Sequence, residues 1–294
     1  MKPATFEYVA ATSLDEAVGV LAQHGDEAKV IAGGQSLVPM MAFRLATPAV
    51  LVDLNRVTAL EHVRYEGDAL VLGAMARHRD VQDLPGLGER CAMLAEGVDL
   101  IGHPAIRNRG TVGGSLAHAD PAAEWPAMLV ALGGSVEAVG PSGGRRIAAE
   151  DLFDTYFTTT LAPDEILTEV RLPLPNGGAV GSCFVELARR HGDFAIAGVA
   201  AMVKLADDGS VAESRIGLIG VRDVPVRARA AESLLSGAQP TDDVLAEAAG
   251  AVDAEIDPVS DLHGSAGYRR RVAAVLVERA LATARDRARE RSGG

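Results

Sequence analysis

The chain has 294 residues, a length that favours two domains or one domain with an appendix. Hydrophobic residues make up 48% and charged residues 23%, which is typical of a soluble globular protein. Its net charge of −12 argues against a nucleic-acid partner, because a polyanion would be repelled. Its two cysteines, Cys91 and Cys183, cannot supply the four thiolates that an iron–sulfur cluster needs. No apolar run is long enough to span a bilayer and no secretory signal is present, so a cytoplasmic location is predicted.

The first 56 residues are predicted to form a small β-α-β-α-β unit. Ser13 and Glu16 form a capping-box pattern, apolar residues follow at helical spacing, and Gly25 stands where a left-handed helix end is expected. A short apolar strand at 29–32 runs directly into a pair of glycines. A second helix and another strand are expected at 37–45 and 49–54.

Residues 57–176 are predicted to form a second lobe of mixed structure. Its strands are expected at 69–74, 135–139, 145–148 and 166–172, and its helices at 89–101 and 125–132. The segment Gly140–Gly144 matches the hydrolase pattern G-x-S-x-G, which needs a turn from strand to helix. Here it lies between two short strands, so we interpret it as a hairpin turn. The proline- and glycine-rich stretch 173–178 is the predicted linker.

Residues 177–294 are predicted to form a C-terminal domain with a small antiparallel sheet backed by helices. Strands are expected at 183–188, 195–205 and 211–221, and helices at 227–235, 242–252 and 266–291. The predicted fold class is therefore α+β, with one domain at 1–176, divided into lobes at 1–56 and 57–176, and a second at 177–294.

Two glycine pairs are the most informative feature, in the segments Ala32–Ser36 and Thr111–Ser115. No G-x-G-x-x-G and no Gly-Lys dipeptide occurs, so the common nucleotide-binding folds are not indicated. A single glycine pair is as often a plain turn as a binding loop, since glycine tolerates positive φ. Together, each followed by a serine, the two pairs predict a diphosphate cradle built from backbone N–H groups and hydroxyls.

Polar residues follow the second pair. We expect Glu124 to accept hydrogen bonds from ribose or ribityl hydroxyls, although an acidic residue in the first turn of a helix also has a purely structural explanation. His118 and Asp120 form a conceivable metal or acid–base pair, but too few ligands follow, and His118 is interpreted as a polar loop residue. The charged cluster Arg189–Asp193 is interpreted as a solvated turn, with contact to a partner or to the bound cofactor as the alternative.

These motifs, their order and the segment 182–201 resemble the FAD-binding medium subunit of the molybdenum hydroxylases, the xanthine dehydrogenase and carbon monoxide dehydrogenase family. The resemblance implies a two-lobed flavin domain of the p-cresol methylhydroxylase type. It also implies a large partner subunit with a molybdenum–pterin cofactor and a small one with two [2Fe–2S] clusters, assembled as a dimer of heterotrimers. Electrons would pass from the clusters to FAD on this chain and on to an external acceptor.

The resemblance also implies which residues contact FAD. It assigns no catalytic residue and no metal ligand to this chain. The implied contacts of the diphosphate are Ala32, Gly33, Gly34, Gln35, Ser36, Leu37, Thr111, Gly113, Gly114 and Ser115. The other implied FAD-binding residues are Ile101, His118, Glu124, Leu167 and Phe194.

The sequence departs from the family at two positions. Val185 stands where the animal enzymes have a lysine beside the flavin, and Ser115 stands where carbon monoxide dehydrogenases tend to have an acidic residue. The second departure favours an N-heterocycle, purine or aldehyde as the substrate of the complex. Two other functions stay open: a free-standing flavoenzyme of the same fold, and a non-catalytic assembly subunit. The electron acceptor also stays open among NAD, a quinone, a cytochrome and oxygen.

Overall fold

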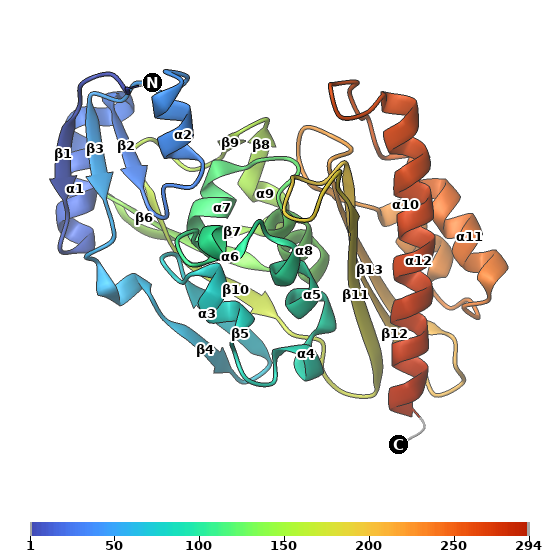
Figure 1. Ribbon diagram of the computed structural model, residues 1–294. Helices are drawn as coiled ribbons and strands as arrows, with labels where there is room; N and C mark the ends of the chain where they lie inside the picture. Colours follow the sequence, from blue (N-terminus) through green and yellow to red (C-terminus); the bar gives the residue numbers. More distant parts are fainter. Residues whose placement is uncertain (1, 293–294) are drawn as a thin grey trace.

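The computed structural model describes residues 2–292 and contains three main sheets, one for each of three consecutive parts of the chain (Figure 1). The N-terminal lobe is a parallel sheet of order β1-β3-β2 with two helices, as the β-α-β-α-β pattern predicts. Its elements are β1 (Glu7–Ala10), α1 (Leu14–His24), β2 (Ala28–Ile31), α2 (Leu37–Ala42) and β3 (Val50–Asp53).

The start of α1 differs from the predicted capping box in one detail. Ser13 Oγ accepts the Glu16 N–H at 3.2 Å, as expected. The Glu16 carboxylate, however, accepts hydrogen bonds from both the backbone N–H and the hydroxyl of Thr12, at 2.8 and 2.9 Å. Gly25 ends the helix with a positive φ of +52°, as predicted, but its ψ of −131° lies outside the left-handed helical region.

The second lobe is an antiparallel five-stranded sheet of order β4-β5-β10-β6-β7 covered by short helices. Its strands are β4 (Val63–Glu66), β5 (Ala69–Gly73), β6 (Ser135–Gly140), β7 (Gly143–Ala148) and β10 (Ile166–Pro173), with a separate pair β8 (Phe153–Thr155) and β9 (Thr158–Thr159). Its helices are α3 (His78–Gln82), α4 (Leu87–Arg90), α5 (Ala92–Leu100), α6 (Pro104–Arg107), α7 (Val112–His118), α8 (Glu124–Leu132) and α9 (Ala149–Leu152). The hairpin predicted at Gly140–Gly144 is confirmed, since β6 and β7 meet there.

Two helices of this lobe differ from expectation. The single helix predicted at 89–101 is broken at Cys91, which is extended (φ −157°), and Ser182 Oγ of the C-terminal domain accepts the Met93 N–H at 3.2 Å. A partner 89 residues away thus caps the start of α5. The second glycine pair lies within the first turn of α7, a helix that the sequence pattern did not predict.

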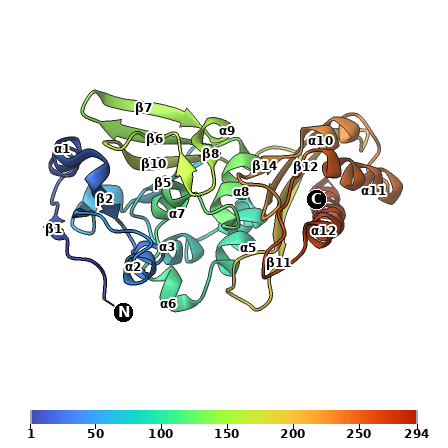
Figure 2. The same cartoon turned by 90° about the horizontal axis from the view of Figure 1, so that it is seen from above.

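The C-terminal domain is an antiparallel sheet of order β11-β12-β13-β14 with three helices, as predicted. Its elements are β11 (Ala179–Leu187), β12 (Ala197–Leu205), β13 (Val211–Ile219), β14 (Val226–Arg227), α10 (Arg229–Leu235), α11 (Asp242–Ala251) and α12 (Ala266–Ser292). Helix α12 covers one face of this sheet, while α5 and α8 of the second lobe cover the other (Figures 1 and 2). Both faces are therefore buried, which explains the nearly continuous apolar sequence of β12.

Candidate functional site

The first glycine turn, Ala32–Ser36, connects β2 to α2 and offers unpaired donors. Gly34 has a φ of +74°, a left-handed conformation that favours glycine. Within residues 2–292, the backbone N–H groups of residues 33–36 donate to no protein acceptor. The Gln35 side chain donates to the carbonyl of Gly33 at 3.0 Å, which stabilises the turn from within. A run of free N–H groups before a helix is an anion-binding arrangement, as the sequence predicted for this turn.

The second glycine turn is built differently, and here the expected row of free backbone donors is wrong. Thr111 Oγ1 caps α7 by accepting the Gly114 N–H at 3.1 Å, and the Ser115 N–H donates to the Thr111 carbonyl at 3.0 Å. The N–H groups of Val112 and Gly113 donate to carbonyls that follow β5. The backbone N–H groups of residues 112–115 are therefore already hydrogen-bonded within the protein. The hydroxyl groups of Thr111 and Ser115 remain as donors on this side.

The fold brings the two turns into direct contact, because their glycines leave room for it. A Cβ atom added to Gly33 would lie 2.3 Å from the carbonyl oxygen of Arg109, two residues before Thr111. A Cβ atom added to Gly114 would lie 3.4 Å from Cβ of Ala32. Free donors on one turn thus lie beside hydroxyls on the other, a donor set that fits a diphosphate approaching closely to the backbone.

Buried carboxyl groups lie beyond α7. Glu124 is the first residue of α8 and is only 5% exposed. Burial, together with the charge of Glu186, raises the pKa of Glu124 to about 8. Burial also raises the pKa of Glu186 to about 7, and its Oε2 has no hydrogen-bond partner among the described residues. A largely protonated Glu124 donates as well as accepts hydrogen bonds, which suits contact with hydroxyl groups.

The remaining predicted FAD contacts occupy different environments. Ile101 and Leu167 belong to the hydrophobic core of the second lobe, with 7% and 5% exposed. His118 lies at the end of α7 and not in a loop; its ring contacts that of Phe157 at a centroid distance of 5.2 Å, and burial lowers its pKa. Phe194 is 61% exposed, on the loop between β11 and β12.

The charged cluster Arg189–Asp193 lies on that same loop. Arg189 and Arg190 are exposed, and the Asp193 N–H donates to the Arg190 carbonyl at 3.1 Å, in agreement with a solvated turn. The loop also reaches the second lobe, since a Cβ atom added to Gly192 would lie 2.6 Å from the ring of His103.

Two residues beside the turns were missed by the sequence reasoning. Asn55, which follows β3, donates from Nδ2 to the carbonyl of Ala32 at 2.9 Å. Arg77, which precedes α3, donates to Oδ1 of Asn55 at 2.6 Å and also to the carbonyl of Arg109. No local motif marks these residues, because each acts on a partner at least 22 residues away.

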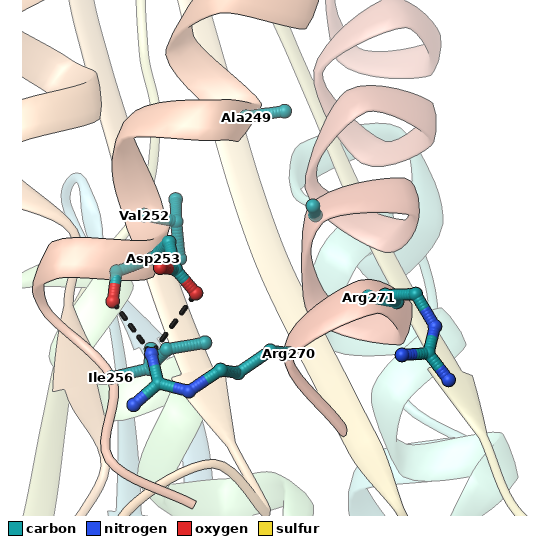
Figure 3. Close-up of a pocket in the computed structure, with 7 residues that line it drawn as sticks. Ala249, Val252, Asp253, Ile256, Arg270 and Arg271 are labelled. Carbon is teal, nitrogen blue, oxygen red and sulfur yellow. Dashed lines mark hydrogen bonds and ion pairs between the residues drawn. The ribbon is translucent and has the colours of Figure 1, made fainter. Parts of the chain in front are cut away.

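Two cavities lie away from the glycine turns. One of about 240 Å³ lies between α11 and α12, with an apolar floor that includes Val252 and Ile256 (Figure 3). Arg270 at its edge pairs with Asp253, while Arg271 extends away from that pair. Another, of about 150 Å³, lies between the linker and the C-terminal sheet. Neither is lined by a residue of the two turns.

Among residues 2–292, Cys91 and Cys183 are both buried and free. In this part of the chain, no group of three His, Cys, Asp or Glu side chains is placed to hold a metal ion. No helix in the same range is both long and apolar enough to cross a membrane.

Comparisons with known proteins cover nearly the whole chain. A family model for the FAD binding domain in molybdopterin dehydrogenase matches residues 4–175, and one for the CO dehydrogenase flavoprotein C-terminal domain matches residues 182–284. The 6-hydroxypseudooxynicotine dehydrogenase complex subunit alpha of Paenarthrobacter nicotinovorans is 43% identical over 290 residues, which are 98% of this chain and 97% of that protein. The caffeine dehydrogenase subunit beta of a Pseudomonas species is 37% identical, over 98% and 97% of the two chains.

Solved structures agree with these relatives. Carbon monoxide dehydrogenase from Hydrogenophaga pseudoflava matches with a TM-score of 0.94 and 40% identity, over 98% of this chain and 99% of the other. Quinoline 2-oxidoreductase from Pseudomonas putida 86 matches with a TM-score of 0.91 and 36% identity, over 98% and 99%. The predicted fold class is confirmed. The chain belongs to the family of FAD-binding medium subunits of the molybdenum hydroxylases.

Proposed function

We propose that the two glycine turns hold the diphosphate of FAD and that this chain is the electron exit of a molybdenum hydroxylase complex. The observation that carries the proposal is the set of free N–H groups at residues 33–36, held against the hydroxyl-bearing second turn. FAD supplies two-electron redox chemistry, receiving electrons from [2Fe–2S] clusters of a partner subunit and delivering them to an external acceptor.

The residues of this chain have distinct proposed tasks. Ala32–Leu37 surround the diphosphate with backbone donors, while Thr111, Gly113, Gly114 and Ser115 complete the cradle with hydroxyls and a close backbone approach. Glu124 binds the sugar-like hydroxyl groups, an assignment that its burial and raised pKa support. The proposed surroundings of the flavin ring are Ile101, His118, Leu167 and Phe194.

The proposed assembly has a large molybdenum-cofactor subunit, a small iron–sulfur subunit and this chain, arranged as a dimer of heterotrimers in the cytoplasm. The names of the relatives as subunits of dehydrogenase complexes support the assembly. We further propose that the chain divides into 1–176, with lobes at 1–56 and 57–176, and 177–294; the ranges of the two family models support this division.

For the substrate of the complex, we propose the class of N-heterocycles, purines and aldehydes. Ser115 supports this choice, as do two relatives whose names specify 6-hydroxypseudooxynicotine and caffeine. No residue of this chain is proposed to touch that substrate, because its oxidation is assigned to the molybdenum subunit.

The proposal is tested by the ultraviolet–visible spectrum of the purified chain and by its titration with FAD. We expect one FAD per chain, with iron–sulfur and molybdenum copurifying when the partner subunits are coexpressed. A chain that binds no flavin would be an assembly subunit. A chain that oxidises an organic substrate without its partners would be a free-standing flavoenzyme. Either result refutes the proposal.

A further inference from the structure

The contact between the two glycine turns depends on side chains that belong to neither turn. Asn55 directly follows Leu54, whose N–H donates to the carbonyl of Ile31 at 3.1 Å, and it therefore lies beside the end of β2. Its Nδ2 donates to the carbonyl of Ala32 at 2.9 Å, the residue that opens the first turn. The Asn55 side chain is oriented by Asp53, whose Oδ1 accepts a hydrogen bond from Asn55 Nδ2 and, at 2.8 Å, one from the Asn55 backbone N–H.

Arg77 joins this arrangement from the second lobe. Its guanidinium group donates from Nη2 to Oδ1 of Asn55 at 2.6 Å and from Nη1 to the carbonyl of Arg109. That carbonyl is the atom against which Gly33 packs. One planar guanidinium therefore fixes the position of both turns at once, which a lysine with a single ammonium group cannot reproduce.

The backbone of Arg77 is also fixed by hydrogen bonds. It forms an antiparallel bridge with Thr111, the cap of α7, and Asp80 accepts the Arg77 N–H at 2.9 Å. The side chain is half-buried, and burial, followed by the charge of Arg109, lowers the pKa of Arg77. Arg77 thus lies beside a second cation, Arg109, at a place where the hydrogen bonds of Arg77 connect the two lobes.

We propose that Asn55 and Arg77 are positioning residues that act as one strut between the lobes, setting the spacing of the glycine turns and thereby the affinity for FAD. This inference rests on the proposed function, since it takes FAD as the ligand of the turns. Removal of Asn55 leaves the carbonyl of Ala32 without this donor, and removal of Arg77 does the same for the carbonyl of Arg109, just before the second turn. Either loss lets the turns shift relative to each other. The strut acts through geometry, so the loss of one member makes the other ineffective.

The test is a double-mutant cycle on FAD affinity in the full chain, stripped of flavin and titrated with FAD. Asn55→Ala and Arg77→Ala are each expected to raise the Kd about tenfold or more, as the loss of a partly buried hydrogen bond implies. The double variant should lose about as much as either single variant and not their product. Arg77→Lys should remain impaired, while Asn55→Gln should recover part of the affinity through its conserved amide group.

A matched control is Arg146→Ala, an exposed arginine of the same lobe paired with Glu137 on the neighbouring strand. It should leave the Kd unchanged and combine with Asn55→Ala additively. Thermal unfolding of each flavin-free variant shows whether the fold is intact; if Arg77→Ala does not fold, Asn55→Gln and Arg77→Lys carry the comparison. Additive losses, or unchanged affinity in the folded variants, would overturn the strut while the original chain still binds FAD. If the original chain binds no flavin, the proposed function itself fails.

Discussion

Replacing Gly33 with alanine tests how closely the two turns must approach. The added Cβ would lie 2.3 Å from the Arg109 carbonyl oxygen and 2.7 Å from Cα of Gly110, both of which are backbone atoms. Ordinary contacts of this kind begin near 3.4 Å, so the turns must separate by about 1 Å. The φ of Gly33 lies outside the left-handed region, so the expected effect comes from this contact and not from backbone strain.

The magnitude follows from the hydrogen bonds that a 1 Å displacement breaks. N–H···O bonds near 2.9 Å become too long to count at about 3.9 Å, and bonds to charged acceptors contribute roughly 1.5–3 kcal/mol each. The loss of two such bonds costs at least about 3 kcal/mol, which raises the Kd for FAD at least about 100-fold. Fluorescence titration with FAD measures the Kd, and thermal unfolding of the flavin-free chain measures the cost to the fold, expected at about 1–3 kcal/mol.

Gly19→Ala is the matched control for this substitution. Gly19 lies within α1 of the same lobe, and an added Cβ meets nothing within 4 Å. We expect it to stabilise the fold by about 0.5–1 kcal/mol, as alanine does in a helix interior, and to leave the Kd unchanged. If Gly33→Ala binds FAD within about threefold of the unaltered chain, close approach of the turns is not required for binding, and the reasoning is refuted.

Three other variants probe separate parts of the molecule. Gly114→Val should abolish measurable FAD binding while the flavin-free chain still folds, because its Cβ would lie 2.6 Å from Thr111 Oγ1; stoichiometric FAD after gel filtration would contradict the cradle. The pKa of Glu124 is about 8 in the folded chain against 4.5 ordinarily, so the folded state binds more protons and its stability falls as the pH rises from about 4.5 to about 8. Glu124→Gln should remove this cost, on the order of 3 kcal/mol at pH 7, and flatten the pH dependence of urea unfolding; an unchanged profile would refute it. Arg287→Ala removes donors to Glu96 and to the Ser182 carbonyl, and should lower the free energy of unfolding by about 1–2 kcal/mol, since the ion pair is partly exposed; a change below about 0.3 kcal/mol would count against this contact.

The sequence predicts best those features that depend on neighbouring residues. The cap at Ser13, the end of α1 at Gly25 and the hairpin at Gly140–Gly144 were all predicted, because each is determined by residues within a few positions. Short apolar runs bounded by turn residues also predicted most of the strands. What it could not predict is α7, because its first turn contains two glycines and its stability comes from contacts with the end of β5.

The features that were missed share a dependence on distant partners. Ser182 caps α5 from another domain, and Asn55 reaches Ala32 from the end of a neighbouring strand. In both cases a common polar residue gains its role only when the fold brings an unpaired backbone group to it. Composition and periodicity do not indicate contacts between residues that are far apart in the sequence. The residues that position a site are therefore harder to predict than the motif that binds the ligand.

The difference between the two glycine turns gives the pairs separate physical roles. In the first turn the left-handed Gly34 keeps successive N–H groups free, and Gly33 admits the Arg109 carbonyl. In the second turn the backbone donors are already used by the protein, so its glycines serve close packing, and its hydroxyls are what remain for a ligand. A substitution in the first turn should therefore act through lost donors as well as through space, and one in the second mainly through space. Serine-to-alanine variants separate the two contributions: Ser115→Ala should weaken FAD binding by a single hydrogen bond, about 1 kcal/mol, without altering the spacing that Gly33 permits.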